Sequence, residues 1–566
     1  MAVLTQSYVR GPSEPKLLDW NIAQLLDIQS QQYGARVALV SLHQNVRLTY
    51  SDLRLSVREI ALRLVEHGIS PGDRIAILAG NCVEFVQILF ATMAIGAIAV
   101  LLPLVSNSDE LVKSVTSVEL SLIFMAERIG YRSSAETLRR LANAHEGRVV
   151  VIGSEPLILP PAGCVSFRDY QSPSFVPNSR SDGDGEAKLG RFWGKVSQSS
   201  PCCFQFTSGT TGPRSVSMLS HRNLVNNAYL VGYQLQLSAS DRLCCSPPLS
   251  HCFGLVCGLL ASYTHGATLV MPSEIFDPAL SLQCLREENC TVVHAVPSMF
   301  DAMLRQAKKP QQGGGVSAVD YKLRSGFIAG STPPKNLLRS LREQLGLERL
   351  IYPFAVCSCT SVNHSLIDDN TSVGTALPHT AMKIIDNELG VMPVDVPGEL
   401  CVSGYLVHLG YFRNGEKTKA TTHTDDSGTL WFHTGDIATL DKNGRCKIIG
   451  RSKDMIKKHG ENIAPRDIED VLLAHSSVGN AAVVGIPDEK SGEAVVAFVE
   501  LRNRGTVDAR QLRIWLRERK LTPHKMPDHF ITIGDVDGCL TKMPLNATGK
   551  ILKTELRSFA QNYVGV

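Results

Sequence analysis

An early alternation of strand, helix and strand constrains the fold of this chain most. Residues 74–79 (RIAILA) form a short β-rich run, and Asn81 is placed to cap a helix over residues 83–94. Gly96 ends that helix, and residues 97–102 (AIAVLL) begin the next strand. This order of elements is typical of a parallel sheet that carries helices on its faces.

The same rhythm recurs in the middle of the chain. Residues 267–271 (ATLVM) and 290–295 (CTVVHA) predict two further strands, the second followed by Pro297 near a helix start. A length of 566 residues suggests about four structural units, several of which can fuse. We therefore expect an α/β protein with a large N-terminal domain of several subdomains built on parallel sheets.

The regular alternation of predicted strands and helices ends near residue 430. Residues 437–440 and 445–449 flank an Asn443-Gly444 pair, which predicts a hairpin. The elements expected beyond it are a helix from Pro465, strands at 480–486, 494–501 and 530–533, and a helix at 509–520. They predict a small α+β domain, with the chain divided into residues 1–449 and 450–566.

Charge and composition exclude several classes of protein. Lys and Arg number 57 and Asp and Glu 54, a near-balance that argues against a nucleic-acid partner. The apolar run at residues 85–105 is interrupted by Gln87, Thr92, Gly96 and Pro103. It therefore predicts a buried helix and strand and no transmembrane segment.

The cysteines and the two ends of the chain bear on its compartment. The 15 cysteines show neither a zinc-site spacing nor a disulfide framework, so reduced thiols in an intracellular compartment fit best. The N-terminus lacks a secretory pattern, and the C-terminal NYVGV is not the peroxisomal tripeptide. We expect a cytoplasmic protein, with the peroxisome as the alternative.

A loop rich in hydroxyls and glycine follows a predicted strand at residues 204–206. Its glycines allow the backbone to approach an anion, and its amides and hydroxyls can surround phosphate oxygens. The spacing fits neither a Walker loop nor a dinucleotide-binding turn, which leaves another kind of phosphate loop or a plain surface loop. The loop consists of Thr207, Ser208, Gly209, Thr210, Thr211 and Gly212.

With six further motifs in matching order, this loop resembles the signature of the adenylate-forming superfamily. That superfamily contains acyl-CoA synthetases, adenylation domains of peptide synthetases and beetle luciferases. The likeness runs from about residue 17 to 560, and the branch it resembles most is the medium-chain and related fatty acyl-CoA ligases. The further motifs are residues 247–251 (PPLSH), 328–333 (IAGSTP), 433–436 (HTGD), 450–454 (GRSKD), 460–463 (GENI) and 544–550 (PLNATGK).

The resemblance implies a reaction in two halves that uses ATP, Mg²⁺ and coenzyme A. A carboxylate attacks the α-phosphate of ATP and pyrophosphate leaves; the thiol of coenzyme A then attacks the acyl-adenylate. Lys550 would serve the first half, because a flexible ammonium can reach both the carboxylate and the phosphate. His251 would lie beside the acyl carboxylate, although a lone histidine in an apolar run is more often a core residue.

The resemblance also implies nucleotide contacts. Asp436 would accept hydrogen bonds from the ribose hydroxyls, and Arg451 would contact ribose or phosphate; a turn residue and a structural salt bridge are the alternatives. Lys453 would be the hinge of the small domain, and Gly460 would line the coenzyme A channel. The remaining residues implied for ATP or AMP are the loop residues above with Gly330, Ser331, Thr332 and Phe354.

The sequence departs from the family pattern at three positions. Ser215 stands where the phosphate loop usually has a lysine, so a phosphate contact is either lost or taken over by Arg214. Ser358 replaces the glutamate that usually helps to hold Mg²⁺, which leaves Thr210 as a neutral metal ligand. His459 replaces a glycine and would crowd the coenzyme A channel.

Three functions fit this pattern. The first is an ATP-dependent acyl-CoA ligase for a fatty or polyketide-like acid, of the kind specialised in fungal secondary metabolism. The second transfers the adenylated acid to a separate carrier protein. The third is a nucleotide-binding paralogue without turnover that acts by interaction, favoured by Ser215 and Ser358 and disfavoured by Lys550, Asp436 and Arg451.

Overall fold

The computed structural model describes most of the chain. Ser208, Gly209, Thr210, Thr211, Gly212, Arg214 and Lys550 lie outside the described residues. The described residues are 4–104, 108–144, 148–153, 164–172, 185–207, 215–308, 321–354, 358–360, 366, 371–503, 505–534, 540–545 and 551–564.

Two seven-stranded sheets, parallel except for one edge strand each, dominate the first half and confirm the expected α/β class. The first has the order β10 (Cys164–Ser166), β9 (Val149–Ile152), β6 (Leu122–Ala126), β4 (Arg74–Leu78), β5 (Ile98–Leu101), β11 (Pro201–Phe206) and antiparallel β12 (Val216–Ser220). The second has the order β17 (Leu350–Ile351), β16 (Ser325–Ile328), β15 (Val292–Ala295), β13 (Arg242–Cys245), β14 (Thr268–Met271), β2 (Val37–Ser41) and antiparallel β3 (Val46–Thr49).

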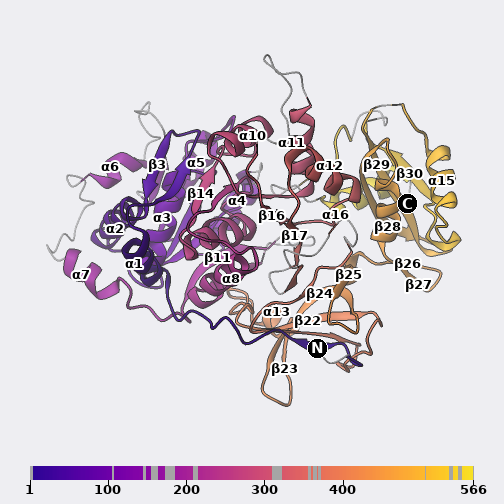
Figure 1. The fold of residues 1–566 in the computed structure, drawn as a ribbon, viewed down its shortest axis with the longest axis horizontal. Coiled ribbons are helices and arrows are strands. Elements are labelled where there is room, and N and C mark those ends of the chain that lie inside the picture. Colours follow the sequence, from indigo (N-terminus) through magenta and orange to yellow (C-terminus); the bar gives the residue numbers. More distant parts are fainter. Residues whose placement is uncertain are drawn as a thin grey trace.

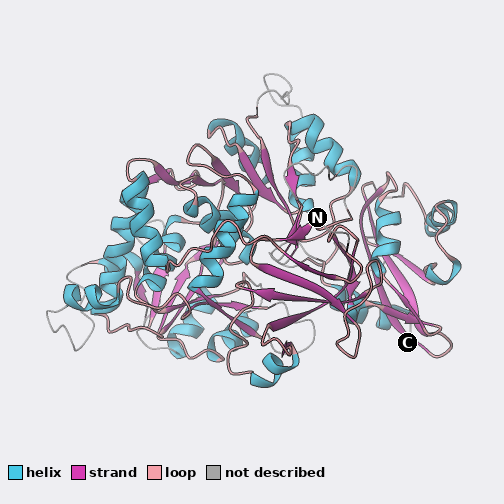
Figure 2. Ribbon diagram, turned by 60° about the horizontal axis from the view of Figure 1, so that its bottom comes forward, coloured by secondary structure: helices cyan, strands magenta, loops and turns pink. Residues whose placement is uncertain are grey.

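Helices cover the faces of both sheets (Figure 2). The described helices of this region are α1 (Ile22–Tyr33), α2 (Tyr50–Glu66), α3 (Val83–Ala94), α4 (Ser108–Thr116), α5 (Ala135–Ala144), α6 (Phe167–Gln171), α7 (Gly185–Phe192), α8 (His221–Gln234), the π-helix η1 (Phe253–Leu260), α9 (Ala261–Thr264), α10 (Pro278–Glu287), α11 (Pro297–Ala307) and α12 (Lys335–Leu345).

Helix α3 lies almost entirely inside the protein. Phe85, Ile88 and Phe90 are fully buried, and within the helix only Glu84 and Gln87 are partly exposed. Among the described residues, no helix is both long and apolar enough to cross a membrane. The apolar run of the sequence therefore corresponds to α3 and β5.

The expected cap of α3 is wrong. Cys82 occupies the N-cap position and makes no side-chain cap. The amide of Asn81 instead donates to the carbonyl of Pro247 (3.1 Å) and accepts the backbone N–H of Leu249 (2.8 Å). Asn81 therefore joins the end of β4 to the segment after β13, and so links the carboxyl edges of the two sheets.

A third, antiparallel sheet includes both chain ends of the large region. The N-terminus lies in this sheet because β1 pairs with β21 (Figure 1). The predicted hairpin is confirmed, since Leu440 pairs with Cys446 and Gly444 has a φ of 74°. The strands are β1 (Tyr8–Arg10), β21 (Thr380–Ile385), β22 (Gly398–Gly404), β24 (Leu430–Leu440), β23 (Thr422–Thr424) and β25 (Cys446–Arg451), and helix α13 (Gly415–Ala420) precedes β23.

Two smaller sheets complete this region. One is a ribbon of β7 (Arg128–Ile129) and β8 (Arg132–Ser133). The other joins β18 (Pro353–Phe354), β19 (Ser358–Cys359) and β20 (Thr375–Ala376).

The chain leaves the third sheet at Arg451 and enters a five-stranded sheet at Ile456, through the short 3₁₀ helix η3 (Ser452–Asp454). This α+β unit, yellow in Figure 1, has an apolar core that includes Ile468 and Leu472. Its elements are β26 (Ile456–Lys458), β27 (Glu461–Ile463), α14 (Pro465–Leu473), β28 (Val478–Asp488), β29 (Gly492–Leu501), α15 (Ala509–Glu518), η4 (Pro523–Lys525), β30 (His529–Thr532) and α16 (Lys553–Val564).

Candidate functional site

The carboxyl edge of the second sheet gathers several of the predicted residues. His251 follows β13, Gly330 follows β16, and Phe354 follows β17. In parallel sheets the chain turns outward at this edge, and ligands bind in the crevice that these turns form. The fold thus brings together residues that are about a hundred positions apart in the sequence.

The loop after β16 exposes a backbone glycine and a serine hydroxyl to solvent. Gly330 has a φ of 96°, which favours glycine, and a Cβ at this position would lie 3.3 Å from Val296 Cγ1. Gly330 and Ser331 are exposed. The half-buried Thr332 contacts the hydroxyl of Tyr352 through its Oγ1 at 3.4 Å. A ligand at this edge can therefore reach the backbone of Gly330 and the hydroxyl of Ser331.

His251 is exposed at the same edge and is not packed in the core. Its Nδ1 accepts the backbone N–H of Phe253 at 3.2 Å and lies 3.6 Å from Cys252 Sγ. Burial raises the pKa of the Cys252 thiol, but the neighbouring His251 and the backbone N–H groups of Phe253 and Cys252 together bring that pKa below its usual value. A titratable pair therefore borders the apolar helix η1.

The described ends of the phosphate loop are held together by Thr207 and Ser215. The N–H of Thr207 donates to the carbonyl of Ser215 at 2.8 Å, and the Thr207 hydroxyl donates to the same carbonyl at 3.1 Å. The hydroxyl of Ser215 in turn accepts a hydrogen bond from Lys417 Nζ at 2.8 Å. No sequence motif pointed to Lys417, because 202 residues separate it from Ser215.

Asp436 and Arg451 face each other across β24 and β25. Arg451 Nε lies 3.1 Å from Asp436 Oδ1, and the side chains are 45% and 7% exposed for Arg451 and Asp436. The carboxylate is thus nearly buried beside one partly exposed cation. This arrangement leaves the pair at the junction between the third sheet and η3.

The turn before Asp436 is held by Glu399. Glu399 Oε1 accepts the backbone N–H of Gly435 at 3.1 Å, and the Thr434 hydroxyl donates to the carbonyl of Leu400 at 2.8 Å. The same hydroxyl accepts the backbone N–H of Asp436 at 3.1 Å. The backbone on both sides of the turn is therefore fixed before any ligand binds.

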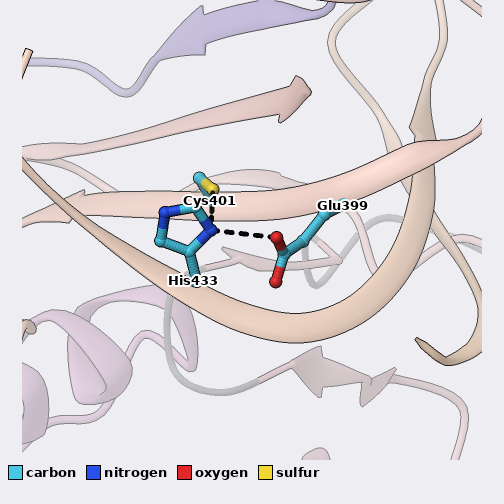
Figure 3. A group of neighbouring side chains, drawn as sticks. All are labelled: Glu399, Cys401 and His433. Atoms are coloured by element: carbon cyan, nitrogen blue, oxygen red, sulfur yellow. Dashed lines mark hydrogen bonds and ion pairs between the residues drawn. The ribbon is translucent and has the colours of Figure 1, made fainter. Parts of the chain in front are cut away.

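Figure 3 shows Glu399 and Cys401 directed at the ring of His433. His433 Nδ1 lies 2.9 Å from Glu399 Oε2 and 3.5 Å from Cys401 Sγ, a spacing that could group around a metal ion. Burial and the charge of Glu399 raise the pKa of the Cys401 thiol to about 12. His433 Nε2 also lies 2.7 Å from His423 Nδ1. We interpret the group as a hydrogen-bonded chain that orients Glu399, since a protonated thiol is a weak metal ligand.

Lys453, the predicted hinge residue, lies beside a cleft. Lys453 is exposed in η3, and a cavity of about 770 Å³ is lined by Gly435, Arg451, Lys453 and Gly492 among others. Gly460 lies in the tight turn that joins β26 and β27, where its φ is 80° and that of His459 is 52°. A two-residue turn in which both φ values are positive is the favoured hairpin connection. The turn alone therefore accounts for a glycine at position 460, whether or not Gly460 also lines a channel.

Ser358, expected near the metal, is fully buried in β19. Among the described residues its hydroxyl has no hydrogen-bond partner. An unpaired buried oxygen can accept a ligand, but it contributes no negative charge. A carboxylate at this position would need a cation beside it to offset its desolvation.

The architecture is that of an adenylate-forming enzyme: two parallel sheets joined at their carboxyl edges, a third sheet with an Asp–Arg pair, and a small unit beyond a short connector. Residues 26–412 match the family described as AMP-binding enzyme, and residues 467–550 match the AMP-binding enzyme C-terminal domain. The chain belongs to the AMP-binding enzyme family, and the resemblance read from the motifs is confirmed.

Relatives match the chain over nearly its whole length. It is 38% identical to the acyl-CoA ligase sidI of Aspergillus fumigatus, over 98% of this chain and 93% of the relative. It is 32% identical to the mitochondrial medium-chain acyl-CoA ligase ACSF2 of Mus musculus, over 99% and 90%. The fold is also that of the anthranilate CoA ligase AuaEII in complex with anthranoyl-AMP, with a TM-score of 0.80, 22% identity, and 97% and 99% coverage.

Proposed function

We propose that the chain is an ATP-dependent acyl-CoA ligase that activates a carboxylic acid as acyl-AMP and transfers the acyl group to coenzyme A. The observation that carries the proposal is the match, over nearly the whole chain, to relatives named as acyl-CoA ligases. The apolar helix η1 beside His251 favours a fatty or similarly apolar acid.

In the first half-reaction, one carboxylate oxygen bonds to the α-phosphorus as the bond to pyrophosphate breaks. The chain has to position the reactants and neutralise charge. Asp436 would hold the ribose with Arg451 beside it, and Lys550 would place its ammonium between carboxylate and α-phosphate. Gly330, Ser331, Thr332 and Phe354 would border the base, and the loop from Thr207 to Gly212 the phosphates.

Mg²⁺ bound to ATP would neutralise phosphate charge during this step. The residues present fit such an ion only in part, because the buried hydroxyl of Ser358 is unpaired among the described residues and uncharged. We propose that the ATP phosphates and water supply most of its ligands, with Thr210 as an additional neutral oxygen.

In the second half-reaction, the sulfur of coenzyme A bonds to the acyl carbon and AMP leaves. We propose that residues 450–566 turn about Lys453 relative to residues 1–449 between the two steps, so that Gly460 lines the thiol channel. Transfer to a separate carrier protein stays the alternative for this half. The cytoplasm, favoured by the sequence, stays a prediction for the compartment.

Pyrophosphate release across a panel of fatty and aromatic acids, with and without coenzyme A and Mg²⁺, tests the proposal. A ligase releases pyrophosphate with its acid and forms an acyl-CoA that mass spectrometry detects. Acyl transfer only to a carrier protein would replace the second half of the proposal. ATP binding without pyrophosphate release from any acid would favour the non-catalytic reading.

A further inference from the structure

Lys417 places its ammonium directly at the end of the phosphate loop. Its Nζ donates to the hydroxyl of Ser215 at 2.8 Å and lies 4.4 Å from the centre of the Tyr411 ring. The side chain is half-buried, unlike that of Lys419 on the same helix, which is exposed. This position is more typical of a lysine that binds the loop or its ligand than of a solvent-exposed surface lysine.

The fold holds Lys417 there by backbone pairing. The chain before α13 runs antiparallel to β12: the N–H of Phe412 donates to the carbonyl of Val216, and that of Leu409 to the carbonyl of Met218, both at 2.8 Å. Asn414 then caps α13 by accepting the N–H of Lys417 at 2.9 Å. Because β12 starts directly after Ser215, this pairing sets α13 beside the loop.

The partners that the structure describes for the ammonium are uncharged. Among the described residues, no carboxylate forms an ion pair with Lys417, whose partners are a hydroxyl and an aromatic ring. Burial lowers the pKa of Lys417, and the charge of Lys453 lowers it further. Lys417 is therefore a partly buried cation near the exposed Lys453, and an anion bound beside it would stabilise its charge.

We propose that Lys417 binds the phosphate chain of ATP beyond the α-phosphate, and so supplies from α13 the charge that Ser215 does not supply from the loop. This inference rests on the proposed function, because it assigns a residue to the same nucleotide site. It adds a third possibility to the two that the sequence left open, which were loss of the phosphate contact and its replacement by Arg214.

Binding of ATP, inorganic pyrophosphate and AMP to the full-length chain, measured by calorimetry without any acid, tests the proposal. Lys417→Ala should weaken ATP and pyrophosphate binding about ten- to a hundredfold, the loss expected for one charge-assisted hydrogen bond, and change AMP binding less than about threefold. Lys419→Ala is the matched control, since it removes the same charge from an exposed position on the same helix. An equal loss for ATP and AMP, or no difference between the two variants, would overturn the proposal.

A second variant separates loss of the charge from damage to the fold. Lys417→Ala combined with Ser215→Lys should recover ATP affinity to within about threefold of the wild type, because the cation returns to the same end of the loop. A double variant that melts like the wild type and still binds ATP as weakly as Lys417→Ala contradicts the assignment. If the wild type binds ATP with this dependence but converts no acid, the ligase proposal fails and the assignment of Lys417 stands.

Discussion

Arg451 Nε lies 3.1 Å from Asp436 Oδ1, and the two residues are direct partners in the register of β24 and β25. The carboxylate proposed to bind ribose is therefore tied to the last residue of the third sheet. The next residue begins η3, which contains the proposed hinge Lys453. The ion pair thus joins the carboxylate proposed to bind the nucleotide to the residue that precedes the small unit.

Asp436→Asn should weaken ATP and AMP binding to a similar degree, by about tenfold or more. The amide keeps the shape of the carboxylate but loses the charge that strengthens hydrogen bonds from the ribose hydroxyls and from Arg451. Calorimetry with both nucleotides measures the loss. Asp426→Asn, an exposed carboxylate in the turn between β23 and β24, is the control. A loss confined to ATP would place Asp436 at the phosphates.

Lys453→Pro should leave adenylation nearly intact and impair transfer to coenzyme A. Proline fixes φ and removes the N–H, and both changes hinder a rotation of the backbone at η3. Pyrophosphate exchange reports the first half-reaction, and thioester formation from supplied acyl-AMP reports the second. Lys453→Ala controls for loss of the charge. Normal thioester formation by the proline variant would contradict the proposed alternation.

Lys550→Ala should abolish formation of the acyl-adenylate, while thioester formation from supplied acyl-AMP largely persists. The charge of this lysine is needed only while the carboxylate and the α-phosphate approach each other. The exposed Lys542 provides a matched control as Lys542→Ala. Equal loss of both half-reactions in a variant that melts normally would assign Lys550 a different role.

Local pattern was sufficient to predict helix α3 from its first residue to its last. Gly96, with a φ of 82°, closes the turn after it, and the apolar residues between leave no alternative to burial. The prediction that Asn81 caps α3 was wrong because its actual partners, Pro247 and Leu249, are distant in the sequence. A short polar side chain before a helix has the same local pattern whether it caps the helix or binds another segment.

The candidate site could be predicted only where a motif carries the residue. Asp436, Arg451 and Gly330 were found because their neighbours in the sequence form a recognisable pattern. Lys417 was not, because only the pairing of residues 409–412 with β12 brings it to Ser215. Likewise, the family pattern indicated that Ser358 stands in place of a glutamate. It could not indicate that the serine hydroxyl is fully buried.

Ser358→Glu should lower the Mg²⁺ concentration needed for half-maximal pyrophosphate release. The buried carboxylate should also lower the melting temperature without ligand, and Mg²⁺ with ATP should restore it by more than in the wild type. Ser358→Ala controls for loss of the hydroxyl alone. An active glutamate variant with an unchanged Mg²⁺ midpoint would show that position 358 does not face the metal.

His294 provides a test of the core beneath the acyl segment. Its Nδ1 accepts the N–H of Phe327 at 3.2 Å, its Nε2 lies 3.0 Å from the carbonyl of Cys257, and its ring stacks on Phe253. The carbonyl contact requires the proton on Nε2, and the N–H contact leaves Nδ1 as an acceptor, so the ring is neutral. Burial lowers the pKa of His294 to about 4.

The folded state should therefore lose stability as the pH falls below about 6.5. In the unfolded chain this histidine has a pKa near 6.5, whereas in the folded protein its pKa is about 4. Between these two values the unfolded state binds more protons, so lowering the pH favours unfolding. Over that window the difference amounts to roughly 3 kcal/mol in the free energy of unfolding, from about 1.4 kcal/mol per unit. His294→Gln keeps an acceptor and a donor but cannot titrate, so its urea midpoint should fall less between pH 7 and pH 5. His524→Gln, at a partly exposed position outside this core, controls for the loss of a histidine as such. Equal slopes for all three proteins would mean that the folded His294 takes up a proton as readily as the unfolded chain.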